Sequence, residues 1–149
     1  MSMGSSRLIF VDTWAWLALA NRKDAYHSVA QRGYAQIKAA GDRLVTSDYV
    51  LDETITALFR SVAYKNAVQF VESLFLMVDG ARLGLERITK SRFEAAWLLR
   101  KRYQDKPNVS FTDLTSIVLM QELAINTVFT GDTHFEEANV GLEILLKMK

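Results

Sequence analysis

The stretch that decides the fold of this chain is Leu8-Ile9-Phe10-Val11-Asp12-Thr13. Its four apolar residues do not alternate with polar ones, which is typical of a strand buried on both faces of a parallel sheet. The run ends at Asp12, and a helical pattern follows over residues 13–20. A strand that passes directly into a helix is the repeating unit of an α/β domain.

The rest of the chain repeats this change from a short apolar run to a longer helical pattern, which predicts a mainly parallel sheet. Further strands are expected over residues 43–46, 81–88, 126–130 and 142–146, the second of them weaker. A helix is expected from Asp24 to about Ala40, a second starts at Ser47, and a third follows it and ends at about Met77. Further helices are expected over residues 89–103, 111–123 and 134–138. Most aromatic residues of the early helices are expected in the core, namely Trp14, Trp16, Tyr49, Phe59, Phe70 and Phe75. Residues 7–146 are therefore expected to form one domain, preceded by a flexible N-terminus at residues 1–6.

Four acidic residues stand at element boundaries or on a helix face: Asp12, Glu53, Asp113 and Asp132. Asp12 and Asp132 each follow an expected strand directly, so both fall on the edge where open parallel sheets bind their ligands. Carboxylates that meet there repel one another, by roughly 4 kcal/mol per pair at 4 Å and an effective dielectric near 20. A divalent cation held by oxygen ligands offsets such repulsion, and this predicts a metal-dependent phosphodiesterase site.

Composition narrows the choice of metal and of compartment. The chain has no cysteine and only two histidines, so thiolate sites are excluded and an all-nitrogen zinc site is disfavoured. The expected ion is therefore Mg²⁺ or Mn²⁺, bound by carboxylates and water. The N-terminus lacks the pattern of a signal peptide, and no stretch reaches the roughly 18 apolar residues that a membrane-spanning helix needs. A cytoplasmic protein without a membrane partner is expected.

Each acid also has an ordinary structural interpretation. Asp12 can cap the helix that follows it, and Ser110-x-x-Asp113 is a near match to a capping box. Asp132 follows a glycine and suits a turn. Glu53 lies inside its helix, nearly opposite the apolar stripe, where a solvated side chain would also lie, and Asp52 on the flank of that stripe is the rival ligand.

The order and the settings of the four acids resemble a known family. Ile9-Phe10-Val11-Asp12-Thr13, an acid in a helix near position 50, Ser110-Phe111-Thr112-Asp113 and Thr130-Gly131-Asp132-Thr133-His134-Phe135 together look like a PIN domain. The likeness is greatest to the small single-domain toxins of VapBC-type toxin–antitoxin systems, and it covers residues 7–146.

The resemblance implies a three-layer α/β/α sandwich around a mainly parallel sheet, with Mg²⁺- or Mn²⁺-dependent ribonuclease activity. Carried over by position, Asp12, Glu53, Asp113 and Asp132 match the acidic quartet of the family, and Glu53 is preferred to Asp52. Asp12 and Asp113 are the expected direct ligands, while Glu53 and Asp132 bind through water, hold a second ion or orient the attacking water. Thr13 and Ser110 fall where the family often has supporting hydroxyl groups. The resemblance also implies an RNA substrate, a cognate antitoxin protein and a homodimer.

Three other interpretations remain at the level of sequence. The first is a PIN-domain ribonuclease of RNA processing that has no antitoxin, and the second is a non-catalytic binding module in which the acids serve only as caps and turn residues. The third, phosphomonoester hydrolysis at an aspartyl nucleophile, is disfavoured because Trp14 stands where a second aspartate is needed. Net charge is only +1, but residues 87–106 hold seven basic residues against two acids, a set that contacts phosphates or simply forms a solvated face.

Overall fold

The computed structural model describes residues 6–137 and 143–144, and within them five parallel strands form one sheet in the order β3-β2-β1-β4-β5. The strands are β1 (Leu8–Val11), β2 (Arg43–Ser47), β3 (Leu83–Glu86), β4 (Thr127–Phe129) and β5 (Glu143–Ile144). Phe10 is paired with Val45 on one side and with Val128 on the other, so β1 is the central strand. The expected parallel α/β sheet is confirmed.

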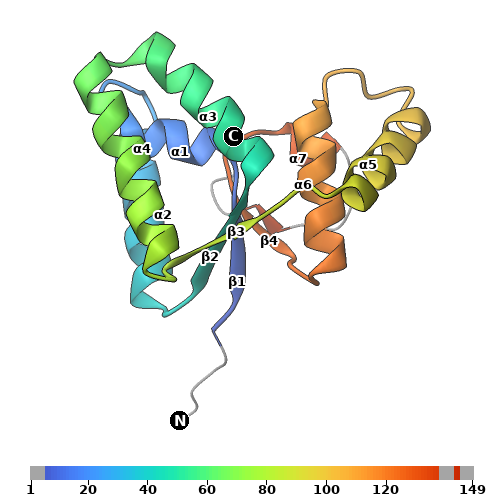
Figure 1. Ribbon diagram of the computed structural model, residues 1–149, viewed down its shortest axis with the longest axis horizontal. Helices are drawn as coiled ribbons and strands as arrows, with labels where there is room; N and C mark the ends of the chain where they lie inside the picture. Colours follow the sequence, from blue (N-terminus) through green and yellow to red (C-terminus); the bar gives the residue numbers. More distant parts are fainter. Residues whose placement is uncertain (1–5, 138–142, 145–149) are drawn as a thin grey trace.

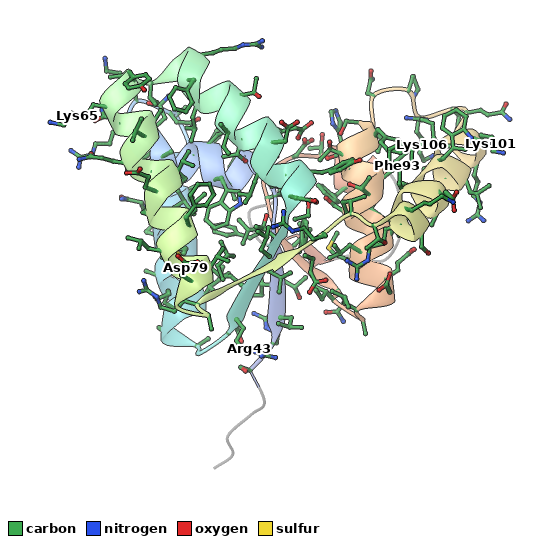
Figure 2. All side chains as sticks on the ribbon, viewed as in Figure 1. Arg43, Lys65, Asp79, Phe93, Lys101 and Lys106 are labelled. Atoms are coloured by element: carbon green, nitrogen blue, oxygen red, sulfur yellow. The ribbon has the colours of Figure 1, made fainter. Side chains whose placement is uncertain are left out.

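Helices cover both faces of the sheet, with α1 to α4 on one side and α5 and α6 on the other (Figure 1). Their bounds are α1 (Thr13–Ala20), α2 (His27–Ala39), α3 (Asp48–Ser61), α4 (Tyr64–Asp79), α5 (Lys90–Arg102), α6 (Phe111–Glu122) and α7 (His134–Glu137). Charged side chains such as Lys65 and Lys101 point away from the sheet into solvent (Figure 2). The three-layer α/β/α arrangement follows from this placement. None of the helices in the described ranges is both long and apolar enough to cross a membrane.

The core is built around β1, because Ile9, Phe10 and Val11 are all fully buried. Both faces of the central strand are covered by helices, which explains why its sequence shows no alternation. A smaller cluster of Leu58, Ala67 and Val71 joins α3 to α4. The predicted packing is wrong for Phe59 and Phe75, which are 43% and 47% exposed on the outer faces of these two helices.

Most element boundaries agree with the sequence to within two residues, and the start of α2 is the main exception. Asp24 does not cap this helix: its carboxylate accepts a hydrogen bond from the backbone of Tyr26, and helical structure begins only at His27. This local turn competes with the helix for the aspartate side chain. Parts of the expected final strand and short helix, at residues 138, 142, 145 and 146, lie outside the described residues.

The strand order places a topological switch point between β1 and β4. The chain leaves β1 for β2 on one side of the sheet, whereas β4 is added on the other side of β1. Ligands of open α/β sheets bind beyond the carboxyl ends of the strands at this point. The segments that follow β1 and β4 therefore lie where a site is expected.

Candidate active site

Four separate elements bring the predicted acids toward this edge of the sheet. Asp12 follows β1 and is the N-cap residue of α1, and Asp132 follows β4. Asp113 lies in the first turn of α6, and Glu53 lies inside α3, the helix that follows β2. The parallel direction of β1, β2 and β4 explains why positions far apart in the sequence meet at one edge.

Thr130 joins two of the acids. Its hydroxyl donates a hydrogen bond to Oδ2 of Asp12 at 3.0 Å and accepts one from the backbone N–H of Asp132, also at 3.0 Å. Thr130 is fully buried, and the strand pairing fixes its position because Val11 is paired with Phe129. The contact therefore holds the carboxylate after β1 and the turn after β4 in fixed relative positions.

The structure argues against the capping interpretation of Asp12. The side chain makes no N-cap hydrogen bond and accepts the bond from Thr130; the backbone of Thr13, the first residue of α1, also acts on the carboxylate and lowers its pKa. Asp12 is only 3% exposed, which is unusual for a carboxylate that forms no salt bridge with any residue the structure describes. Its burial needs an explanation other than helix capping.

Asp113 serves as a cap and faces the cluster at the same time. It forms a complete capping box with Ser110, in which Oγ of Ser110 accepts from the backbone of Asp113 and Asp113 accepts from the backbone of Ser110. The predicted capping box is thus confirmed. Asp113 is 5% exposed, and its Oδ2 lies 3.8 Å from Nδ1 of His134.

Glu53 and Asp52 occupy different environments on α3. Glu53 is half-buried, and its Oε1 accepts a hydrogen bond from the hydroxyl of Thr13 at 3.0 Å. Asp52 is exposed on the outer face of the helix. The hydroxyl of Thr13, at the start of α1, therefore ties the glutamate to the segment that carries Asp12.

The acids of the cluster raise one another's pKa values. Burial, with a smaller effect of nearby Asp113, raises the pKa of Asp12 from 3.8 to about 7 despite the hydrogen bond from Thr130. Burial and then Asp132 raise the pKa of Asp113 to about 6, with a lesser contribution from Glu53. Within the described part of the chain, lysine and arginine ion pairs go to other carboxylates, among them Asp42, Asp48 and Glu122. Repulsion between the acids therefore adds to the effect of burial, and none of the lysine and arginine ion pairs of the described residues involves these acids.

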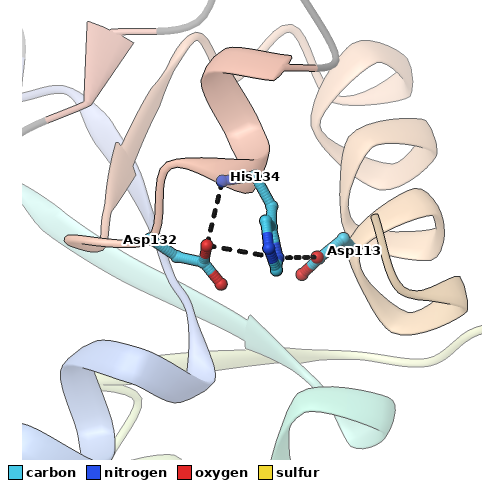
Figure 3. A group of neighbouring side chains, drawn as sticks. All are labelled: Asp113, Asp132 and His134. Carbon is cyan, nitrogen blue, oxygen red and sulfur yellow. Dashed lines mark hydrogen bonds and ion pairs between the residues drawn. The ribbon is translucent and has the colours of Figure 1, made fainter. Parts of the chain in front are cut away.

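The donor atoms of the cluster fit a divalent cation. One oxygen each from Asp113 and Asp132 and one ring nitrogen of His134 lie within 4.8 Å of one another. Figure 3 shows the imidazole between the two carboxylates. Oxygen-rich sets of this kind suit Mg²⁺ and Mn²⁺, and imidazole adds affinity for first-row transition ions.

Sequence reasoning missed two contributions to this site. The role of Thr130 as a bridge was not predicted, because it depends on the pairing of β1 with β4. The second is the packing of Trp14 against Gly131: a Cβ atom on that glycine would lie 2.6 Å from Cη2 and 2.8 Å from Cε2 of the indole. Trp14 thereby supports the turn that carries Asp132.

Comparison with known proteins identifies the family of the chain. The family model described as PIN domain matches residues 9–141, and the chain belongs to the PIN-domain family. It is 34% identical over 131 residues to the 23S rRNA-specific endonuclease VapC20 of Mycobacterium tuberculosis strain H37Rv, covering 88% of this chain and 94% of that protein.

Solved structures give the same result for the fold. A crystal structure of M. tuberculosis VapC20, described as a toxin that cleaves the sarcin-ricin loop, superposes with a TM-score of 0.77 at 31% identity, covering 90% of this chain and 98% of that one. A DNA-bound VapBC structure from Salmonella typhimurium superposes with a TM-score of 0.65 at 18% identity, covering 94% and 97% of the two chains. The second likeness concerns the fold alone.

Proposed function

We propose that this protein is an Mg²⁺- or Mn²⁺-dependent endoribonuclease that hydrolyses RNA phosphodiester bonds. The observation that carries the proposal is the convergence of Asp12, Glu53, Asp113 and Asp132 beyond β1 and β4, with two of them buried. A binding module that used its acids only as caps has no reason to bury Asp12 without a capping bond. A cation site gives that reason.

In this proposal Asp12 and Asp113 are direct ligands, and Glu53 and Asp132 act through water, hold a second ion or orient the attacking water. A bound divalent cation supplies an activated water and neutralises charge that develops on the phosphate in the transition state. Thr130 and Ser110 are positioning residues in this proposal, because each forms a hydrogen bond with a proposed ligand, Thr130 with Asp12 and Ser110 with Asp113. Thr13 plays the same part for Glu53.

The likeness to VapC20 supports a more specific proposal. We infer that the chain is the toxin of a toxin–antitoxin pair, acts in the cytoplasm as a homodimer and is inhibited by a cognate antitoxin protein. Because VapC20 is named as specific for 23S rRNA, that RNA is the first substrate to test. An RNA-processing enzyme of the same family would lack a small antitoxin reading frame beside its gene.

The decisive assay follows cleavage of 23S rRNA by the purified protein with Mg²⁺, with Mn²⁺ or with EDTA. Two variants of α3 form a matched pair, since Glu53→Gln and Asp52→Asn each remove one negative charge from neighbouring positions. Glu53→Gln is expected to reduce the cleavage rate by ~10–100-fold or more, the range typical for loss of a group that acts on a metal through water. Asp52→Asn is expected to retain the wild-type rate, because its side chain is exposed.

Metal-dependent cleavage that depends on Glu53 supports the nuclease proposal. Cleavage of other RNA but not of 23S rRNA would contradict the proposed substrate but still support the proposed ribonuclease activity. Equal loss in both variants would contradict the assignment of Glu53. An inactive wild-type protein that binds no divalent cation would favour the binding module.

A further inference from the structure

His134 is the residue of the cluster that the acidic quartet leaves unexplained. It begins α7, and its Nδ1 lies 3.3 Å from Oδ1 of Asp132 and 3.8 Å from Oδ2 of Asp113. The ring lies between these two carboxylates (Figure 3). Two carboxylates from different elements thus face the same nitrogen atom.

The backbone fixes the ring in this place. The N–H of His134 donates a hydrogen bond to Oδ1 of Asp132 at 2.9 Å, and the N–H of Asp132 donates to the hydroxyl of Thr130. The next residue, Phe135, is 1% exposed and belongs to the main core cluster. The turn from Thr130 to Phe135 is therefore held at both ends, with the imidazole directed toward the acids.

The ring is not engaged in a strong ionic hydrogen bond. Both distances from Nδ1 exceed the roughly 2.7–2.9 Å of a charge-assisted bond between a cationic nitrogen and a carboxylate oxygen. These two distances agree better with the spacing of ligand atoms around one bound ion. Metal–ligand bonds of about 2.0–2.2 Å place neighbouring ligand atoms about 3 Å apart and opposite ones about 4.2 Å apart. The distances from Nδ1 of His134 to the two carboxylate oxygens, 3.3 and 3.8 Å, fall between these two values.

We propose that His134 is a nitrogen ligand of the cation that Asp113 binds. The same geometry makes Asp132, whose Oδ1 lies 3.3 Å from Nδ1 of His134, a direct ligand of that ion rather than one that acts through water. The inference depends on the proposed function, because it assumes that the site holds a divalent ion. Its consequence concerns ion selectivity. Mg²⁺ takes oxygen ligands, whereas imidazole suits first-row transition ions, so the mixed set favours Mn²⁺ over Mg²⁺ more than carboxylates alone would.

Pulsed electron paramagnetic resonance of the Mn²⁺-loaded wild-type protein tests the ligand directly. Hyperfine coupling from a directly bound ¹⁴N nucleus is expected. The chain has one other histidine, His27, whose Nδ1 contacts the backbone oxygen of Ala18 at 2.8 Å, away from the acids. The coupling should therefore persist in His27→Ala and disappear in His134→Ala.

Equilibrium titrations of Mn²⁺ and Mg²⁺ provide a second readout. His134→Ala is expected to weaken Mn²⁺ binding by ~10-fold or more and Mg²⁺ binding by less. His134→Asp replaces the nitrogen with an oxygen donor, so its preference for Mn²⁺ over Mg²⁺ should be smaller than that of the wild type. Thermal melts of all variants show whether each one is folded.

The outcomes separate this inference from the proposed function. Wild-type protein that binds Mn²⁺ without a directly bound ¹⁴N would overturn the role of His134 and leave the nuclease proposal in place. Unchanged Mn²⁺ affinity in a folded His134→Ala variant would do the same. A wild-type protein that binds no Mn²⁺ would overturn both.

Discussion

At the scale of single residues, Asp12 shows how the site is constructed. A carboxylate at the end of a buried strand is costly, since burial raises its pKa to about 7. The sequence indicated its position after β1 but left capping and metal binding as alternatives. In the structure the Asp12 side chain makes no N-cap hydrogen bond, and its carboxylate accepts a hydrogen bond from the hydroxyl of Thr130.

The raised pKa of Asp12 predicts how the stability of the metal-free protein depends on pH. Between about pH 4 and pH 7 the folded state retains a proton that the unfolded chain has lost, so the free energy of unfolding falls as pH rises. In EDTA, the contribution of Asp12 should lower the melting temperature of the wild type between about pH 5 and pH 7 and level off above that. The Asp12→Asn variant should show a shallower fall and a higher melting temperature at about pH 8.

Asp52→Asn is the control for this series, because it removes an exposed carboxylate and should retain the wild-type slope. If Asp12→Asn has the same slope as the wild type, the buried charge of Asp12 does not govern the pH dependence.

Thr130 gives a second prediction at this scale. Thr130→Val keeps the shape of the side chain but removes the hydroxyl that bridges Asp12 and Asp132. Loss of such a positioning group is expected to weaken Mn²⁺ binding by ~10–100-fold and to cost about 1–3 kcal/mol of stability. Titration calorimetry and denaturant melts measure the two effects.

Thr127→Val, in β4 three residues before Thr130, provides the comparison. Thr127 is also buried, but its hydroxyl bonds only the side chain of Asn126 among the described contacts. It should change stability with little effect on Mn²⁺ affinity. Equal affinities for the two variants would argue against the bridge.

At the scale of elements, local sequence signals predicted most of the structure. Ser47 caps α3 and Thr89 caps α5 as helix-start residues do, and β1 was recognisable from its apolar run alone. What the sequence did not contain was the strand order, which decides that β4 lies beside β1. The Thr130 bridge and the contact of Trp14 with Gly131 both depend on that order, so neither was predictable.

The structure also shows that some basic side chains of residues 87–106 are bound within the protein. Arg92 is bound by Glu86 and Glu122, and Arg100 donates to backbone oxygens of the loop before α6. These two side chains hold α5 and its loop in place. The number of basic residues available to phosphates is therefore smaller than the sequence indicated.

The turn after β4 gives a prediction at this scale. In Gly131→Ala the new Cβ would clash with the indole of Trp14, so the turn must shift and carry Asp132 with it. We expect about 1–3 kcal/mol of destabilisation and weaker Mn²⁺ binding, measured by melts and calorimetry.

Gly84→Ala is the matched control, because its Cβ would approach nothing closer than 3.4 Å. Adding Trp14→Phe to Gly131→Ala should recover part of the loss by opening space. A Gly131→Ala variant that binds Mn²⁺ as the wild type does would show that the turn tolerates the clash.

At the scale of the whole molecule, the sheet collects the acids at one edge, while large apolar side chains remain exposed on helices to either side. Phe75 and Leu76 of α4 and Trp97 and Leu98 of α5 are each about half exposed or more. Such side chains are typical of partner contacts when they cluster. In the proposed homodimer and antitoxin complex, these side chains would contact the partner chains.

The homodimer predicts a solution mass near twice the 16.9 kDa of the chain, measured by light scattering after size exclusion. Trp97→Glu and Phe75→Glu each place a charge on one of the two helices that expose large apolar side chains, α5 and α4, and a variant with half the mass identifies the interface. A wild-type mass of one chain at all concentrations tested would contradict the dimer.

The central claim is that Asp12, Glu53, Asp113 and Asp132 form one divalent-metal site. Calorimetric titration of Mn²⁺ into the wild type and Asp12→Asn near neutral pH tests it most directly. The account predicts saturable binding to the wild type and binding at least ~10-fold weaker in the folded variant. No binding to the wild type, or equal binding to both proteins, would contradict the claim.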